Sequence, residues 1–192
     1  IWNDADNRDG KRPTSITIRL FADGKEVDSV TVEADENNEE EGKNNEWPWS
    51  FTNLPKYRDG GEKIVYTITE DAVPGYDTSI DGYDVENTHV PEVVTVKGTK
   101  TWDDADNQDG KRPTSITINL LADGEVIDTV TVTEEDGWAW SFENLPKNKD
   151  HGTAIIYTVT EEAVDGYEPS VEGFNVTNTH TPETTEVSGT KT

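Results

Sequence analysis

The sequence contains two copies of one pattern, and this internal repeat constrains the fold more than any other feature. Residues 10–18 and residues 110–118 both read Gly-Lys-Arg-Pro-Thr-Ser-Ile-Thr-Ile. The offset between matching positions is 100 residues at this point, and it is 91 residues from Trp47 and Trp138 onward. A repeat of roughly 90 residues has the size of a small domain. The sequence therefore predicts two tandem domains of the same fold.

The change of offset places extra residues in the first copy. We expect this copy to span residues 1–92, with a truncated first strand and an acidic insertion near residues 34–46, because surface loops accept insertions at little energetic cost. The second copy should span residues 93–183. Residues 184–192 resemble the start of the first strand again, so they should open a following repeat, and the chain reads as a fragment of a longer protein.

Alternation of apolar and polar residues predicts short strands in both copies. In the second copy, Ile116, Ile118 and Leu120 alternate with polar residues, and the turn signal Asp123-Gly124 follows them. Further short strands are predicted around residues 126–132, 138–142, 155–159 and 174–176. About seven short strands in about 90 residues are typical of an immunoglobulin-like β-sandwich. We therefore expect an all-β chain with two tandem sandwiches.

The charge of the chain excludes two classes of partner. Asp and Glu together number 41 against 16 Lys and Arg, so the net charge is −25. Such a chain repels the phosphates of nucleic acids and the surface of an anionic membrane, and we predict neither as a partner. The apolar runs are only a few residues long, too short to span a membrane. The sequence contains no cysteine, so any covalent crosslink within this chain must be something other than a disulfide.

Three polar residues fall on strand faces that should point into the core of the second copy. Because side chains alternate between the two faces of a strand, Lys100, Glu161 and Asn178 each share a face with the inward apolar residues of their own strand. The first copy repeats two of them as Glu70 and Asn87. Two interpretations without chemistry are open at this point. The residues sit at strand ends and turn into solvent, or they form a buried ion pair.

Several motifs of the second copy occur in the same order in a known family. They are Lys-x-Trp at 100–102, Arg-Pro at 112–113, Trp-x-Trp-x-Phe-x-Asn-Leu-Pro at 138–146, Tyr-x-Val-x-Glu at 157–161, Gly-Tyr at 166–167 and Asn-Thr at 178–179. The whole chain resembles, twice over, the collagen-adhesin B-type (Cna B-type) repeat of Gram-positive surface proteins and pilins. The resemblance implies a β-sandwich that is crosslinked by a spontaneous isopeptide bond between a lysine and an asparagine.

The resemblance also implies a role for each of the inward polar residues. Lys100 becomes the nucleophile, Asn178 the electrophile and Glu161 the catalytic carboxyl group, with Glu70 as its equivalent in the first copy. Burial lowers the pKa of an amine and raises that of a carboxylic acid, so a neutral amine attacks the amide carbon while the acid supplies protons as ammonia leaves. The event happens once per molecule. We therefore expect no turnover enzyme, no cofactor and no metal site.

Two weaker signals have plainer explanations. The run from Asp104 to Gly110 resembles a calcium loop, but Asp109 stands where the EF-hand pattern needs glycine and Ser115 stands where it needs glutamate. A polar turn is the favoured interpretation, and a nonstandard cation site is the alternative. His89 and His180 are interpreted as strand-end residues rather than metal ligands.

The family resemblance favours a structural role for the chain. We expect rigid, crosslinked spacer repeats in the stalk of a cell-wall-attached surface adhesin, outside the cell. The alternative is a module that binds a host ligand or a glycan, whose identity the sequence does not reveal. The near-identical loops of the two copies favour the spacer function, because a spacer is made longer by repeating the same domain.

Neighbouring repeats of the same protein are the expected partners, and the offsets predict one further contact. The lysine equivalent to Lys100 would precede Ile1, whereas Lys191 lies in the tail 184–192 with no domain behind it. The tail of one molecule would then complete the first copy of the next, head to tail, and Lys191 would bond to Asn87. The plainer alternative is a chain cut at these points, with an uncrosslinked first copy and a loose tail.

Overall fold

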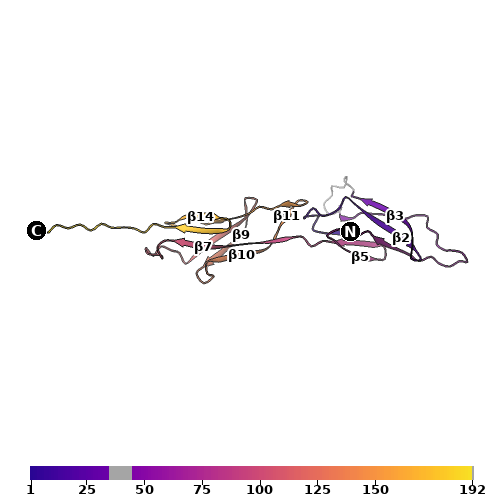
Figure 1. Ribbon diagram of the computed structural model, residues 1–192, viewed down its shortest axis with the longest axis horizontal. Coiled ribbons are helices and arrows are strands. Elements are labelled where there is room, and N and C mark those ends of the chain that lie inside the picture. The colour runs from indigo at the N-terminus through magenta and orange to yellow at the C-terminus, as the bar shows by residue number, and fades with distance from the viewer. Residues whose placement is uncertain (35–44, 192) are drawn as a thin grey trace. The chain divides into compact units, whose positions relative to one another are not determined.

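The computed structural model of the protein describes residues 1–34 and 45–191, and its regular elements are β-strands (Figure 1). The acidic insertion predicted near residues 34–46 lies almost entirely outside the described residues. The strands are β1 (Trp2–Asn3), β2 (Ser15–Ala22), β3 (Lys25–Glu33), β4 (Tyr66–Glu70), β5 (Asp77–Asp81), β6 (Asp84–Thr88), β7 (Val93–Asp103), β8 (Ser115–Ala122), β9 (Glu125–Thr133), β10 (Ala139–Pro146), β11 (Asn148–Lys149), β12 (Thr153–Ala154), β13 (Tyr157–Glu161), β14 (Glu168–Glu172) and β15 (Asn175–Thr179). Among the described residues, no helix is long and apolar enough to cross a membrane.

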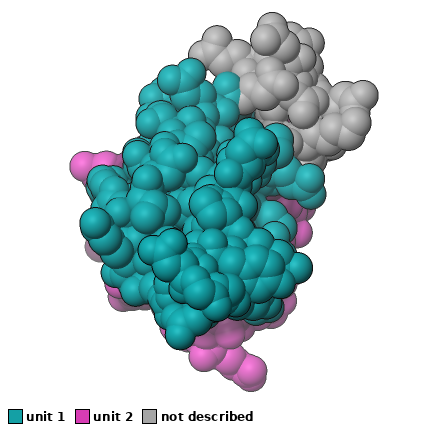
Figure 2. All heavy atoms as spheres, turned by 90° about the vertical axis from the view of Figure 1, so that its right-hand side faces the viewer, with its two compact units in different colours: residues 1–92, 147–154 teal, residues 93–146, 155–192 magenta. Residues whose placement is uncertain are grey.

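The chain divides into two compact units (Figure 2). Unit 1 contains Ile1–Glu92 and Lys147–Ala154, and unit 2 contains Val93–Pro146 and Ile155–Thr192. The segment Lys147–Ala154 lies inside the predicted second copy, yet it groups with unit 1. Within that unit, the Asn148 side chain donates a hydrogen bond of 3.2 Å to Asp9, and the backbone N–H of Gly152 donates one of 2.9 Å to the carbonyl of Arg8. Sequence periodicity alone does not reveal contacts of this kind.

Unit 2 is a sandwich of two main sheets. One has the strand order β10-β7-β15-β14 and the other the order β13-β8-β9. The alternating apolar residues of both sheets point inward and form the core, which contains Val96, Ile116, Ile118, Leu120, Val132, Trp140, Phe142, Val159 and Val176. The predicted all-β, immunoglobulin-like sandwich is therefore confirmed.

Strand β7 holds an internal position in its sheet. It pairs antiparallel with β10 and parallel with β15, where Lys100 is opposite Val176. Val96, Gly98 and Lys100 are buried and the residues between them are exposed, as the two-residue period of a strand requires. At Gly98, a Cβ atom would lie 1.9 Å from the carbonyl oxygen of Phe174, so only glycine fits there.

Unit 1 repeats this architecture, but its first strand is shorter and its described residues form no equivalent of β10. The order β3-β2-β4 forms one sheet and the order β1-β6-β5 forms the other. Strand β1 contains only Trp2 and Asn3, and Trp2 pairs in parallel with Asn87 on β6. Residues 47–51, which match the start of β10, form no strand. In unit 2, β10 pairs with residues 93–99 of β7, whereas β1 of unit 1 matches only the end of β7, at Trp102 and Asp103. Among the described residues, the tryptophan-rich strand expected in both copies therefore forms only in the second.

Candidate functional site

The three polar residues predicted to face the core of the second copy lie in the interior of unit 2. Lys100 on β7 and Glu161 on β13 come from different sheets, and Nζ of Lys100 donates a hydrogen bond of 2.5 Å to Oε1 of Glu161. Their side chains are 0% and 1% exposed. Asn178 is fully buried on β15, the strand next to β7. The alternative in which these residues turn into solvent is therefore wrong.

The interior position changes the acid–base behaviour of Lys100. Burial lowers the pKa of its amine, and the hydrogen bond and charge of Glu161 counteract this effect only in part. An amine with a lowered pKa is more often neutral, and only the neutral amine is a nucleophile. The burial of Lys100 thus favours the neutral, nucleophilic form of its amine.

The side-chain amide of Asn178 lacks hydrogen-bond partners. Neither its Oδ1 nor its Nδ2 has a partner among the described residues, and the same holds for Oε2 of Glu161. A buried polar group without a partner costs about 1–3 kcal/mol. Such unpartnered atoms are unfavourable in a static polar network, and a reactive role is one explanation for them.

Aromatic rings pack around the lysine. Trp102 contacts Trp138 and Tyr167 edge-on, with centroids 5.2 Å and 5.0 Å apart, and Nζ of Lys100 lies 4.6 Å from the Trp102 ring centre. Trp138 has a φ angle of 55°, which is uncommon for a bulky residue, and its carbonyl accepts the backbone N–H of Lys100 at 2.7 Å. The strained residue thus fixes the backbone of the lysine, while the rings keep water away from its amine.

Unit 1 brings Glu70 and Asn87 together, with a third residue that the sequence does not reveal. Nδ2 of Asn87 donates to Oε1 of Glu70 at 2.9 Å, and the hydroxyl of Thr78 donates to Oδ1 of Asn87 at 2.6 Å. Strand pairing places Thr78 opposite Asn87, where unit 2 places Pro169 opposite Asn178. Alternation identifies the face of a residue but not its neighbour across the sheet, so only the strand register reveals Thr78.

Lys191, the remaining residue of the predicted set, lies in the tail that follows unit 2's last strand. It is exposed and belongs to no strand. Its bond to Asn87 stays a prediction.

The run that resembles a calcium loop holds an ion pair. The buried carboxylate of Asp104 accepts hydrogen bonds of 2.6 Å and 3.0 Å from Arg112, one of 2.9 Å from the hydroxyl of Tyr167 and one of 3.0 Å from the N–H of Asn107. The bond from Arg112 is the main reason that the pKa of Asp104 lies well below its usual range. Because the carboxylate of Asp104 already accepts hydrogen bonds from these donors, the structure favours the polar turn over a cation site. In residues 1–34 and 45–191, no three His, Cys, Asp or Glu side chains are placed to hold a metal ion.

His180 directly follows β15 and bonds two acceptors. Its Nδ1 is 2.8 Å from the carbonyl oxygen of Gly166, and its Nε2 is 3.0 Å from Oδ2 of Asp109. An imidazole donates to both only when both nitrogens carry a proton. Accordingly, the hydrogen bond to Asp109 raises the pKa of His180. His89 makes the matching contacts in unit 1.

The stability of unit 2 should fall at alkaline pH because of His180. Its pKa is about 6.5 in the unfolded chain and higher in the folded protein. The charged ring therefore contributes stability that is complete below about pH 6.5 and is lost as the pH rises through the folded pKa. Asp109 favours the charged ring and Lys111 opposes it. Between about pH 6 and about pH 9, the urea midpoint should fall further in the parent than in His180→Gln. Equal falls would contradict the role of this ion pair.

Comparison with known proteins identifies the family. The model of the Cna protein B-type domain matches residues 1–88 and residues 96–179. The chain belongs to the Cna B-type domain family. Each match corresponds to one copy of the repeat, so the Cna B-type pattern accounts for most of the chain.

Two relatives of known identity show how this Cna B-type chain compares with longer proteins. A collagen adhesin of Staphylococcus aureus is 41% identical over 196 residues, which cover 99% of this chain and 16% of the adhesin. The crystal structure of two B repeat units (B1B2) of the collagen binding protein of Staphylococcus aureus aligns with a TM-score of 0.80 and 40% identity, over 94% of this chain and 48% of that one. The chain thus spans a small part of the adhesin and about half of the B1B2 structure.

Proposed function

We propose that the chain is a stalk segment of a cell-wall-attached surface adhesin, in which a spontaneous isopeptide bond between Lys100 and Asn178 makes unit 2 rigid. The observation that carries this proposal is the buried pair of Lys100 and Glu161, together with the buried, unpartnered amide of Asn178 on β15, the strand that pairs with β7. The Staphylococcus aureus relatives are named as a collagen adhesin and a collagen binding protein, which supports a repeat of an adhesin that works outside the cell.

The proposed reaction balances without a cofactor. The neutral Nζ of Lys100 attacks Cγ of Asn178, the bond between Cγ and Nδ2 breaks, and Nδ2 leaves as ammonia. Glu161 takes one proton from Nζ and returns one to the leaving nitrogen. Because the reacting side chains are consumed in the product, the reaction occurs once per molecule and is not enzymatic turnover.

The bond would join two parallel neighbouring strands of unit 2, β7 and β15. By analogy with a disulfide, closing a loop of about 80 residues stabilises the fold by roughly 4 kcal/mol. Tension that enters through β7 and leaves through β15 would pass along the bond and bypass the rest of the domain. This property suits a spacer that carries an adhesive tip under shear.

Neighbouring repeats are the partners that such a segment requires. Head-to-tail self-association through residues 184–192 belongs to the same proposal, because this tail repeats the sequence pattern of β7 and carries Lys191 at the place of Lys100. Asn87 and Glu70 of unit 1 are the residues that this lysine would meet.

Force spectroscopy on a chain held at its two ends tests the stalk function. The parent should show the unfolding of unit 1 but no full extension of unit 2, because the bond keeps the residues between Lys100 and Asn178 out of the force path. A Glu161→Gln chain should show a further event that lengthens the chain by roughly 260 Å. Glu162→Gln changes an exposed neighbour and should behave like the parent. Full extension of unit 2 in the parent would overturn the stalk mechanism.

A further inference from the structure

A second ion pair of unit 2 shares an aromatic ring with Lys100. Arg112 donates hydrogen bonds of 2.6 Å and 3.0 Å to Asp104, whose side chain is 1% exposed. The guanidinium carbon of Arg112 lies 5.5 Å from the centre of the Trp102 ring, and Nζ of Lys100 lies 4.6 Å from the same centre. One indole ring therefore contacts both cations, and the reaction proposed above gives a role to only one of them.

The buried carboxylate of Asp104 is linked to Lys100 by a continuous set of contacts. Trp102 and Asp104 follow Lys100 at steps of two residues, along β7 and just beyond its end. The hydroxyl of Tyr167 donates a hydrogen bond of 2.9 Å to Asp104, and its ring contacts Trp102 edge-on with centroids 5.0 Å apart. The contacts therefore run from the carboxylate through two aromatic rings to the amine.

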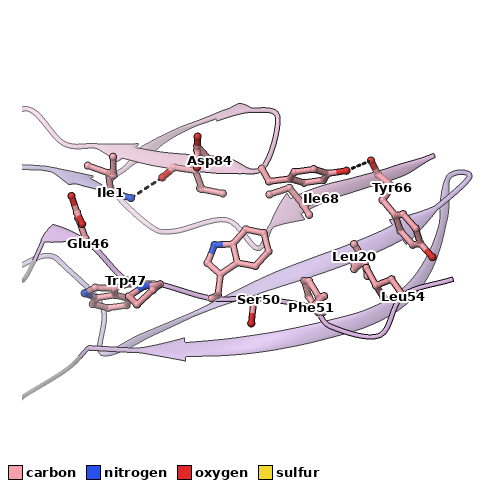
Figure 3. Close-up of a pocket in the computed structure, with 14 residues that line it drawn as sticks. Ile1, Leu20, Glu46, Trp47, Ser50, Phe51, Leu54, Tyr66, Ile68 and Asp84 are labelled. Carbon is pink, nitrogen blue, oxygen red and sulfur yellow. Dashed lines mark hydrogen bonds between the residues drawn. The ribbon is translucent and has the colours of Figure 1, made fainter. Parts of the chain in front are cut away.

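Unit 1 contains the same cluster. The corresponding hydrogen bonds and ring contacts are made by Trp2, Asp4, Arg12 and Tyr76. The rings of Trp2 and Trp47 also meet edge-on, with centroids 4.9 Å apart, as those of Trp102 and Trp138 do. Figure 3 shows Trp47 where it lines a pocket of this unit. The cluster thus follows from the repeated sequence, which includes Arg-Pro at 12–13 and 112–113.

Asp104 would oppose the proposed reaction if its charge were not neutralised. A buried carboxylate near an amine favours the charged amine, and only the neutral amine is a nucleophile. Two unit charges about 10 Å apart within a protein change the neutral fraction of an amine by roughly tenfold. Glu161 on β13 already favours the charged form of Lys100, and an unpaired Asp104 would add to its effect. The guanidinium of Arg112 cancels that second negative charge.

We infer that Arg112 is a positioning residue for the proposed crosslinking reaction, because its pairing with Asp104 against the Trp102 ring prevents this carboxylate from holding Lys100 in the charged form. The inference rests on the proposed function and adds to it a residue that acts on Lys100 through its neighbours. A role in stability alone would make the fold weaker or stronger. The role inferred here also sets the pH at which the crosslink forms.

The other ionisable groups of the cluster leave this pH dependence readable. The hydrogen bond from Arg112 holds the pKa of Asp104 well below its usual range, so the carboxylate is charged. Burial and the hydrogen bond to Asp104 raise the pKa of Tyr167 to about 12, so its hydroxyl is neutral. His180 contacts the Tyr167 ring with centroids 5.3 Å apart and has a raised pKa, but it is present in every variant below. Differences between the variants therefore report on Lys100.

The rate of crosslinking as a function of pH tests the inference. The chain is synthesised in vitro in a short pulse, unfolded in urea and diluted into buffers between about pH 6 and about pH 10. Intact mass follows the loss of one ammonia, and tryptophan fluorescence follows folding in the same samples. The rate of the parent should rise with pH and level off once Lys100 is neutral.

Two variants should move this profile in opposite directions. Arg112→Gln leaves Asp104 unpaired, so the profile should move to higher pH, with crosslinking roughly tenfold slower near neutral pH and equal to the parent at the alkaline plateau. Asp104→Asn leaves Arg112 unpaired, so the profile should move to lower pH and crosslinking near neutral pH should be faster. Lys111→Gln removes a positive charge from the exposed next residue and should keep the profile of the parent.

The outcomes separate this inference from the proposed function. If the parent forms the bond but both variants keep its profile, or both are slower at every pH, Arg112 acts only through the fold and the inference is wrong. If Arg112→Gln does not refold, Asp104→Asn decides alone, and a profile that does not move to lower pH overturns the inference. A parent that forms no bond between Lys100 and Asn178 overturns the proposed function and the inference together.

Discussion

Replacing Glu161 by glutamine should lower the melting temperature of unit 2 by roughly 20 °C. Without this carboxylate the proton transfers fail, and the loss of a crosslink across about 80 residues costs roughly 4 kcal/mol. In a domain of this size, 1 kcal/mol corresponds to about 4–8 °C. Lys100 also stays buried without its charged partner, which adds to the loss. Calorimetry of the parent and the variant measures the shift, with the transition of unit 1 as an internal reference.

Glu162→Gln is the matched control for this experiment. It makes the same change of charge at the next residue, whose side chain is exposed, and should alter stability by no more than about 0.5 kcal/mol. If Glu161→Gln melts at the temperature of the parent, either the bond is absent or it forms without Glu161, and the catalytic role assigned to this residue is wrong.

Gly98→Val should destabilise unit 2 by about 3 kcal/mol or prevent it from folding. A Cβ atom at this position would lie 1.9 Å from the carbonyl oxygen of Phe174 and 2.7 Å from Cζ2 of Trp140. The ring can move, but the carbonyl is backbone and moves only if β7 parts from its neighbours. Lys100 would then leave its place beside Glu161, so crosslinking should slow as well. Urea unfolding and the mass of the purified protein report the two effects.

Thr101→Val is the control for Gly98→Val, because it introduces the same side chain at an exposed position of β7. We expect it to be nearly neutral in stability and fully crosslinked. If the Gly98→Val protein has the same urea midpoint and the same extent of crosslinking as the parent, the close contact between Gly98 and the carbonyl oxygen of Phe174 is contradicted.

The sandwich and its inward polar residues could be predicted because both follow from the period of a strand. A lysine or an asparagine at an inward position is conspicuous in sequence, as at Lys100 and Asn178. The burial of Asp104 could not be predicted in this way. It depends on the backbone of residues 105–107, whose φ angles of 51°, 57° and 59° are left-handed and are not favoured by local preference alone. Tertiary bonds such as that from Arg112 hold this loop in place.

Other features depend on neighbours that are distant in sequence. Thr78 contacts Asn87 because β5 pairs with β6, and the same register places a proline there in unit 2. Residues 47–51 have the sequence of a strand, but a strand requires a partner to pair with. The segment Lys147–Ala154 packs within unit 1 through contacts such as that between Asn148 and Asp9. The alternation of apolar and polar residues within each of these segments does not reveal which distant residues it contacts.

The mass of the parent chain tests the proposed isopeptide bond most directly. If the bond forms, the intact monomer should be lighter than its sequence by one molecule of ammonia, and digestion should yield a branched peptide that joins Lys100 to Asn178. The Glu161→Gln chain should keep the full mass of its own sequence. A parent monomer that retains its full mass after prolonged incubation, or a branched peptide that joins other residues of unit 2, would contradict the bond.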